Sequence, residues 1–216
     1  MANGTTMMAR RAAVLVALFA GGAVLTQAVI NMAAAVAKGE PALPALLVLF
    51  GFFTIWSNTL VALITARYAW KGENGGFLTR PGTMAAATVY IVVVGAIYNV
   101  LLAKLNHVAG LRLATDTVLH SVVPIGYTLW WLVLVPRRRL AWSALLPALA
   151  FPTAYSIVAM TCGALTGKYA YFFIDIDKFG LPRVLLNICA LVAFFAGLMA
   201  LVIAFDRWAH RRAATG

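Results

Sequence analysis

Six apolar runs, each long enough to cross a membrane, constrain the fold of this chain more than any other feature. The hydrocarbon core of a bilayer is about 30 Å thick, so a spanning helix needs about 20 predominantly apolar residues. The sequence therefore predicts an all-α, polytopic membrane protein with one integral membrane domain over residues 1–216, built as a bundle of six transmembrane helices. The expected helices cover residues 12–37, 43–66, 82–103, 111–135, 141–163 and 181–205.

Composition supports the membrane assignment and excludes other classes. The chain is 63% hydrophobic and 11% charged, whereas soluble domains average about 45–50% apolar and about 25% charged residues. A net charge of +11 would suit a nucleic-acid-binding protein, but the basic residues lie at the edges of the apolar runs, as charges that flank membrane spans do. We therefore expect no nucleic-acid partner. The first run is longer than the apolar core of a signal peptide, about 7–15 residues, so we expect a permanent helix there.

The distribution of Lys and Arg predicts the orientation in the membrane. Of the 17 basic residues, those on the side of the expected bundle that carries both termini outnumber those on the other side. Because Lys and Arg are enriched in cytoplasmic loops, we expect both termini in the cytoplasm and a multi-pass location in the cell membrane, the inner membrane of a bacterium. The first group is Arg10, Arg11, Arg67, Lys71, Arg80, Arg137, Arg138, Arg139, Arg207, Arg211 and Arg212, and the second is Lys38, Lys104, Arg112, Lys168, Lys178 and Arg183.

Polar side chains inside the apolar runs converge on the outer half of the expected bundle. Any one of them is best interpreted as structural, because Ser and Thr bond back to their own helix and amides bond neighbouring helices. For the whole set this interpretation weakens, since the inner half is almost free of polar residues. An acidic residue is costly to insert, so an intramembrane ionisable pair such as Asp116 and His120, at i and i+4, indicates function. The converging residues are Gln27, Asn31, Thr54, Tyr98, Asn99, Asp116, His120, Arg183 and Asn187.

The stretch from Phe52 to Asn58 is the centre of this set. Thr54 and Asn58 are four residues apart and share one helical face, and Ser57 adds a third polar group within an otherwise apolar run. A hydroxyl nucleophile needs a base within about 2.6–3.2 Å and a group that orients the base. The sequence therefore suggests Thr54 as nucleophile, His120 as general base and Asp116 as its orienting carboxylate. Asn58, Asn99 or Tyr98 could then supply donors to an oxyanion.

This pairing requires the nucleophile and the base to lie at similar depths. Thr54 is eleven residues into its expected helix, about 16 Å at 1.5 Å per residue, whereas His120 is only five residues beyond Thr115, where the apolar run begins. A helix that starts near Leu111 removes most of that difference. We therefore predict that the fourth helix begins N-terminal to Thr115 and that both side chains face one cavity.

Several local patterns resemble a known family. Taken in order along nearly the whole chain, they are similar to the bacterial branch of the androgen-induced-gene family of multi-pass membrane proteins. Animal members are threonine hydrolases that cleave fatty acid esters of hydroxy fatty acids, and the resemblance places their essential threonine and histidine on Thr54 and His120. It implies a membrane lipid or lipid ester as substrate. The patterns are Phe52-Phe53-Thr54-x-x-Ser57-Asn58, Asp116-x-x-x-His120-x-x-x-Pro124, Phe151-Pro152-x-x-Tyr155, Gly167-x-Tyr169-x-Tyr171-x-Phe173-x-Asp175 and Arg183-Val-Leu-Leu-Asn187.

The fifth connection, between the last two expected helices, is rich in aromatic residues. Buried rings contribute large apolar area, so we expect Tyr169, Tyr171 and Asp175 to fold back as a lid over the pocket, although an aromatic belt at the membrane surface is an equally good interpretation of the tyrosines. We expect Tyr155, Arg183 and Asn187 to line the same pocket.

Other classes of function remain as alternatives. The alternative to a hydrolase is a non-catalytic lipid-binding protein or a small-molecule transporter, but a transporter needs polar residues through both halves of the membrane. His107, His120 and His210 do not form two facing layers, as a haem would require. Cys162 and Cys189 have no metal-ligand spacing. We therefore expect no metal and no cofactor, and the sequence leaves the oligomeric state open.

Overall fold

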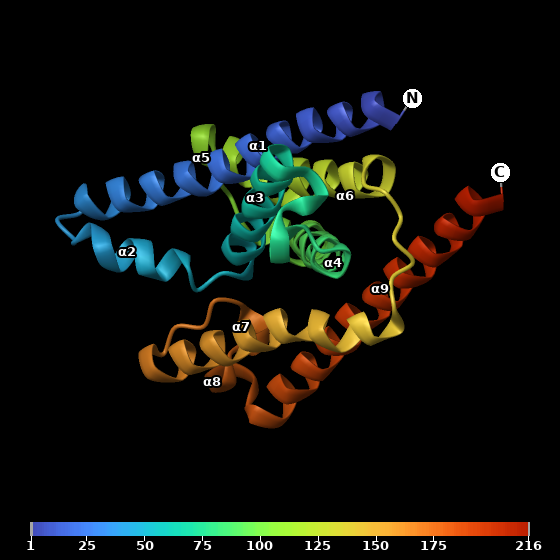
Figure 1. Ribbon diagram of the computed structural model, residues 1–216. Coiled ribbons are helices and arrows are strands. Elements are labelled where there is room, and N and C mark those ends of the chain that lie inside the picture. The colour runs from blue at the N-terminus through green and yellow to red at the C-terminus, as the bar shows by residue number, and fades with distance from the viewer. Residues whose placement is uncertain (1, 216) are drawn as a thin grey trace.

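The computed structural model describes residues 2–215, with side chains for residues 6–212. Within this range the chain is helical and contains no strand, so the predicted all-α class is confirmed (Figure 1). Short 3₁₀ turns occupy 72–74, 76–79, 103–105, 142–144 and 172–174, and π turns occupy 98–102 and 118–122. The α-helices are α1 (Ala2–Val36), α2 (Ala42–Leu49), α3 (Phe53–Lys71), α4 (Pro81–Ile97), α5 (Gly110–Thr117), α6 (Val123–Leu134), α7 (Leu145–Thr166), α8 (Ile176–Phe179) and α9 (Leu181–Thr215).

Five helical stretches of the described chain are long and apolar enough to span a membrane, and the bent pair α2 and α3 brings the number to six. Their limits agree with the predicted helices to within a few residues, except that α1 begins about ten residues earlier and α9 ends about ten residues later than expected. The chain is therefore a polytopic helical bundle. The five unbroken stretches are Thr6–Val36, Pro81–Leu105, Gly110–Leu134, Trp142–Thr166 and Leu181–Arg212.

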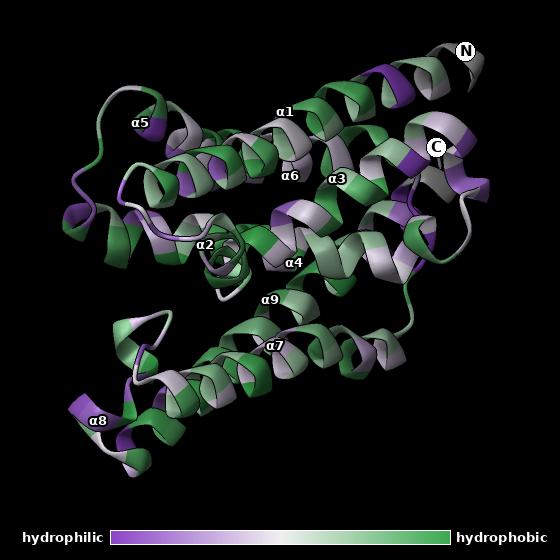
Figure 2. Ribbon diagram, turned by 90° about the vertical axis from the view of Figure 1, so that its left-hand side faces the viewer, coloured by the Kyte–Doolittle hydropathy of each residue, from purple (hydrophilic) through white to green (hydrophobic). Residues whose placement is uncertain are grey.

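Helix α4 lies in the middle of the bundle. Figure 1 shows α1, α3 and α6 on one side of it, and α7 and α9 on the other, and α4 contacts α3, α6, α7 and α9. The span that contains α4 is the most buried of the five. Most of the ribbon is hydrophobic along the helices, and hydrophilic residues gather towards the helix ends and loops (Figure 2), as expected for a protein whose outer surface faces lipid.

Small residues let α1 pack closely on its neighbours. Ala9, Ala13 and Ala20 are buried along one face of α1, at the three- and four-residue spacing that repeats on a helix surface. A Cβ on Gly21 would lie 3.8 Å from the Cβ of Ala62 in α3. Small-residue faces are typical of membrane helix contacts. The hydrophobic effect does not drive association of helices within lipid, so close van der Waals packing must stabilise their contacts.

The predicted single helix over residues 43–66 is wrong. The chain breaks after α2, and α3 continues at an angle of 80°. Gly51 and Phe52 lie in the break, where Phe52 has an extended backbone conformation. Thr54 is consequently in the first turn of α3, whereas a continuous helix would have placed it in the middle of a span, so its expected depth counted from Leu43 does not apply.

Aromatic side chains satisfy the backbone groups that the break sets free. The indole of Trp56 donates to the carbonyl of Phe50 at 2.7 Å, and the hydroxyl of Tyr155 donates to the carbonyl of Gly51 at 2.7 Å. The amide of Phe53 donates to the hydroxyl of Tyr171 at 3.1 Å. Unpaired backbone groups are costly within the hydrocarbon region and are tolerated only where the protein supplies partners. These three bonds therefore make a broken span possible.

The fourth span begins at Gly110, so the prediction that this helix begins N-terminal to Thr115 is confirmed. It is not a uniform helix, because a π turn over Val118–Val122 separates α5 from α6. A second π turn, Tyr98–Leu102, follows α4. Single π turns within helices occur frequently at functional sites, since they re-aim the side chains that they carry.

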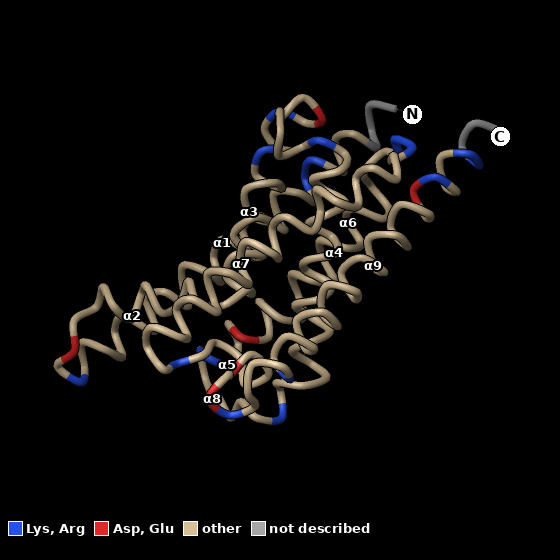
Figure 3. Tube along the Cα trace, turned by 90° about the horizontal axis from the view of Figure 1, so that it is seen from below, with Lys and Arg blue, Asp and Glu red and all other residues tan. Residues whose placement is uncertain are grey.

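The basic residues are unequally distributed between the two ends of the bundle, as the count of Lys and Arg in the sequence predicted. Lys and Arg are most numerous at the end of the bundle where both termini lie (Figure 3). At this end the carboxylate of Asp206, which is buried, accepts from the amide of Leu140 at 2.8 Å and lies 3.7 Å from the guanidinium of Arg137. Burial lowers the pKa of Arg137, and the Asp206 carboxylate opposes that effect. The pair ties α9 to the connection before α7, a link that the sequence did not reveal.

Candidate active site

Thr54 and His120 meet in the structure. The Oγ1 atom of Thr54 lies 3.2 Å from the Nε2 atom of His120, within the distance range of a nucleophile and its base. Thr54 is 9% exposed. The predicted proximity is therefore confirmed, and the break before α3 explains how it arises, because it brings the start of α3 to the π turn that carries His120.

The other ring nitrogen of His120 faces Asp116. Its Nδ1 atom lies 2.9 Å from the backbone carbonyl oxygen of Asp116 and 3.2 Å from the Oδ1 atom of the same residue. Both partners are acceptors, so the tautomer consistent with them carries its hydrogen on Nδ1. The Nε2 lone pair is then directed at the hydroxyl of Thr54. This is the arrangement that a general base requires, and Asp116 occupies the orienting position expected of it.

Tyr98 and Asn106 complete the surroundings of the carboxylate. The hydroxyl of Tyr98 donates to Asp116, and the amide of Asn106 donates to Asp116 at 3.3 Å and to Tyr98 at 3.2 Å. The ring of Tyr98 is stacked on the imidazole of His120, with centroids 3.7 Å apart and planes 14° apart. Sequence reasoning missed Asn106, because it lies in a connection beyond the predicted helices. Tyr98 therefore fixes both the carboxylate and the ring plane of the base.

Two asparagines hold the π turn that carries His120. Asn58 donates to the carbonyl of Thr54 at 2.9 Å and to that of Leu119 at 3.3 Å. Asn99 donates to the carbonyl of His120 at 3.1 Å and to that of Gly95 within its own span at 2.8 Å. The π turn is thus bonded from α3 on one side and from the span of α4 on the other.

The predicted role of Asn58, Asn99 and Tyr98 as oxyanion donors is not supported. The amide groups of both asparagines are bonded to backbone carbonyls, and the Tyr98 hydroxyl is bonded to Asp116. All three residues instead bond to the turn that carries His120 or to its neighbour Asp116. Ser57 is buried, and its hydroxyl has no hydrogen-bond partner among the described residues. Ser57 lines neither of the two pockets that include Thr54.

The Tyr171 hydroxyl lies beside Thr54 at the start of α3. It accepts from the amide of Phe53 at 3.1 Å and also contacts the side chains of Thr54 and Tyr155. Burial raises the pKa of Tyr171, so its phenol remains a neutral donor near physiological pH. The start of α3 adds the positive end of a helix dipole at the same place. Sequence reasoning placed Tyr171 only in a lid, because the break that exposes the start of α3 could not be foreseen.

The fifth connection folds back over the site in part. Tyr171 stacks on Phe173 with centroids 5.2 Å apart and meets the edge of Phe52 at 5.9 Å. Asn187 donates to the carbonyl of Phe173 at 2.7 Å, which anchors the connection to α9. Tyr169 lies on Gly163, where an added Cβ would come within 2.2 Å of its ring.

Three of the predicted pocket residues, Asp175, Arg183 and Asn187, line neither of the pockets at Thr54. Asp175 caps α8 by accepting from the amide of Lys178 at 3.1 Å, so it belongs to the connection and not to a lid. Arg183 lines a separate depression together with Asn187 and Phe179, away from Thr54. Arg183 and Asn187 line the same depression, as their i, i+4 spacing predicts, but Thr54 does not line it.

Two pockets meet at Thr54. The apolar pocket lies among α4, α7, α9 and the fifth connection. The polar pocket lies among α1, the α2–α3 break and the fourth span. Thr54, Tyr98, Leu102 and Tyr171 line both. Other residues of the apolar pocket include Val94, Ile97, Ala159, Met160 and Phe195, and those of the polar pocket include Gln27, Asn31, Asn106, Asp116 and His120.

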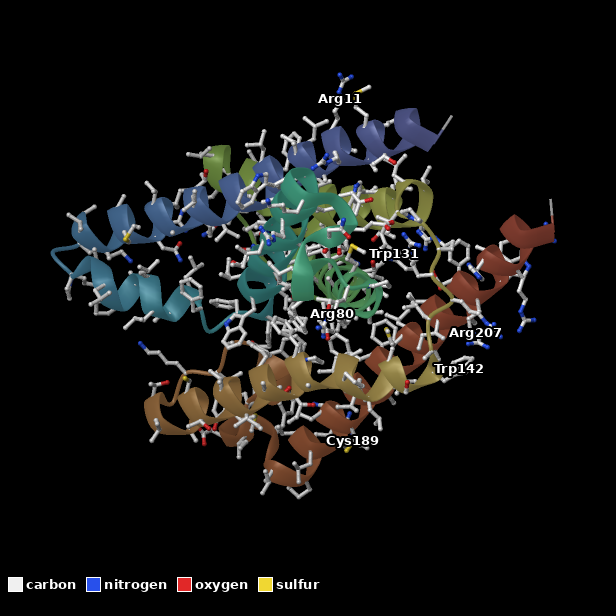
Figure 4. All side chains as sticks on the ribbon, viewed as in Figure 1. Arg11, Arg80, Trp131, Trp142, Cys189 and Arg207 are labelled. Atoms are coloured by element: carbon white, nitrogen blue, oxygen red, sulfur yellow. The ribbon has the colours of Figure 1, made fainter. Side chains whose placement is uncertain are left out.

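The cysteines and basic residues stay away from this site. Cys162 and Cys189 are exposed and not disulfide-bonded, and Figure 4 shows Cys189 on α9, on the side of the bundle opposite α1. Figure 4 also shows Arg11 pointing away from the bundle at the N-terminal part of α1. Within the described residues, no group of three or more His, Cys, Asp and Glu side chains could hold a metal ion.

Comparison of the chain with models of protein families, with curated proteins and with solved structures found no match. The resemblance to the androgen-induced-gene family therefore stays a prediction. The interpretation of the site depends on its own geometry.

Proposed function

We propose that the protein is a membrane-embedded hydrolase of lipid esters, in which Thr54 is the nucleophile and His120 the general base. The observation that carries the proposal is the chain of contacts from Thr54 Oγ1 to His120 Nε2, at 3.2 Å, and from His120 Nδ1 to Asp116 Oδ1, at 3.2 Å. A hydroxyl, an imidazole and a carboxylate in this order form the constellation that serine hydrolases share on unrelated folds.

The acylation step follows from these contacts. Thr54 Oγ1 bonds to the ester carbonyl carbon while its proton passes to His120 Nε2, and Asp116 stabilises the imidazolium that forms. The phenol of Tyr171 and the start of α3 stabilise the negative charge on the carbonyl oxygen. The bond from the carbonyl carbon to the alcohol oxygen then breaks, and the departing alcohol takes the proton from His120.

Deacylation uses the same groups in the reverse order. A water molecule gives a proton to His120, and its oxygen bonds to the carbonyl carbon of the acyl-Thr54 ester. The bond between that carbon and Thr54 Oγ1 breaks, and Oγ1 recovers its proton from His120. The products are a carboxylic acid and an alcohol. We also propose that this reaction takes place in the outer half of the cell membrane, with the termini of the chain in the cytoplasm, because basic residues gather at that end.

Fluorophosphonate labelling tests the proposal, since such a probe phosphonylates a hydroxyl only where a base activates it. The wild-type protein in detergent should be labelled on Thr54. Thr54→Ala and His120→Ala should abolish the label, and Thr88→Val should retain it, because the Thr88 hydroxyl bonds only to the carbonyl of Met84 in its own helix. An unlabelled wild-type protein, or a label that persists in Thr54→Ala, would contradict the proposal.

Non-catalytic lipid binding is the second candidate, and the lining of the apolar pocket favours it. A lipid-binding protein would retain a lipid through purification and show no label. Transport has less support, since the buried hydroxyls of Thr65, Thr88 and Thr115 bond back to carbonyls of their own helices.

A further inference from the structure

The two pockets that meet at Thr54 differ in chemistry, and an ester bound there must place one half in each. Most of the apolar pocket is formed by aliphatic and aromatic side chains. The hydroxyls of Tyr155 and Ser156, which line it, donate to the carbonyls of Gly51 and Pro152. Because these hydroxyls are already bonded, the pocket offers an apolar surface and suits a hydrocarbon chain.

The polar pocket offers hydrogen bonds. Gln27 donates to the Oδ1 atom of Asn31 at 2.9 Å. That bond leaves the side-chain carbonyl of Gln27 and the amide group of Asn31 without further hydrogen bonds within the described part of the chain. A donor and an acceptor side by side match hydroxyl groups, which both donate and accept.

The charge of the polar pocket discriminates between alcohols. Asp116 is its one carboxylate, and neither Lys nor Arg lines it among the described side chains. A phosphate or a carboxylate on the alcohol would lose its hydration beside Asp116 without gaining a cation in return. A neutral polyol would meet no such penalty.

We propose that the substrate is an ester of one long, unbranched fatty acid with a short, neutral polyol, such as a monoacylglycerol. The acyl chain lies in the apolar pocket and the polyol lies against Gln27 and Asn31. This inference rests on the proposed hydrolase function and adds to it which half of the ester each pocket receives.

A matched pair of substrates tests the polar pocket. Purified protein in lipid nanodiscs is given 1-oleoylglycerol or 1-oleoylglycerol 3-phosphate, which differ only in the phosphate. The neutral ester should have a kcat/KM at least about tenfold higher. Asn31→Lys should reduce that preference or reverse it, while Asn31→Gln should preserve it. Equal rates on both esters, or an unchanged preference in Asn31→Lys, would overturn the assignment.

A blocked pocket tests the position of the acyl chain. Ala159 is buried and lines the apolar pocket, so Ala159→Phe should lower the rate on the oleoyl ester at least about tenfold. The rate on a butyryl ester should fall by a smaller factor than the rate on the oleoyl ester, and its cleavage also reports that the variant is folded. Ala193→Phe, at an exposed position of α9 outside the pocket, is the control and should cleave both esters normally.

The outcomes separate the two proposals. If the wild-type protein cleaves neither ester and Thr54 takes no fluorophosphonate label, the hydrolase function itself fails. If Thr54 is labelled and esters are cleaved, but Ala159→Phe does not lower the oleoyl rate relative to the butyryl rate, the hydrolase function stands and the acyl assignment is wrong. If Ala159→Phe also loses the butyryl rate, the smaller Ala159→Leu is measured. Its oleoyl rate must fall by a larger factor than its butyryl rate if the assignment is correct.

Discussion

Thr54 Oγ1 lies 3.2 Å from His120 Nε2, although 66 residues separate the two in sequence. The contact joins the first turn of α3 to a π turn in the fourth span. Neither location is an ordinary position within a helix. A hydroxyl at the positive end of a helix dipole and an imidazole on a π turn are both positions that suit the proposed hydrolase mechanism.

Substitutions of the reacting pair should separate the roles of hydroxyl and base. We expect Thr54→Ala to lower the rate of ester hydrolysis at least about 10³-fold, because the nucleophile is lost. Thr54→Ser should retain measurable activity, since it keeps the hydroxyl. The rates are measured on the same ester with purified proteins. A Thr54→Ala variant as active as the wild type would exclude the mechanism.

Tyr171→Phe should isolate the contribution of the phenol. The variant keeps the stacking on Phe173 and loses only the hydroxyl at the start of α3. Loss of one oxyanion donor costs about 10²–10³-fold in kcat. Tyr169→Phe is the control in the same connection, and its kcat should change little. A kcat for Tyr171→Phe within twofold of the wild type would remove the phenol from the mechanism.

Asn58→Leu should loosen the π turn behind the base. The substitution leaves the carbonyl of Leu119 without its side-chain donor, and an unsatisfied buried group costs about 1–3 kcal/mol. We expect a lower thermal unfolding temperature in detergent and a fluorophosphonate labelling rate reduced about tenfold or more, because His120 is no longer held at the distance of a general base. Thr88→Val should change neither quantity by a comparable amount. An unfolding temperature and a labelling rate both equal to those of the wild type would argue against the clamp.

Gly163→Ala should displace the fifth connection. An added Cβ would lie 2.2 Å from the ring of Tyr169, so the ring must move away from α7. Gly197→Ala on α9 is the matched control, since its Cβ would meet nothing within 4 Å. Limited proteolysis of the connection should become faster in Gly163→Ala and stay unchanged in Gly197→Ala. Identical proteolysis of the two variants would indicate that Tyr169 does not hold the connection down.

The orientation in the membrane has its own test. A reporter enzyme that is active only in the cytoplasm, fused after Gly216, should be active, because the basic residues gather at the end of the bundle that carries the termini. Activity of an extracytoplasmic reporter at the same position would reverse the orientation and place the polar pocket towards the cytoplasm.

The helical class, the number of apolar stretches and most of their limits could be predicted from sequence. These properties follow from local composition, since a run of about 20 apolar residues can satisfy its backbone in a membrane only as a helix. Asp116 and His120 could also be paired, because an i, i+4 spacing places two side chains on one helical face. The choice of Thr54 and His120 came from the chemistry of hydroxyls and imidazoles and from the resemblance to a family.

Only the tertiary structure decided where the second span breaks. Gly51 in an apolar run predicts no 80° bend, and the hydroxyls that satisfy the freed backbone groups, Tyr155 as donor and Tyr171 as acceptor, lie over one hundred residues away. The hydrogen-bond partners of the Asn58 and Asn99 side-chain amides could not be predicted either. Asn58 and Asn99 could equally have faced an oxyanion or a neighbouring carbonyl, and their partners are set by how α3, α4 and the fourth span pack. Local sequence determines which segments are helices, but the partners of a polar group are chosen by long-range packing, which no single run of residues encodes.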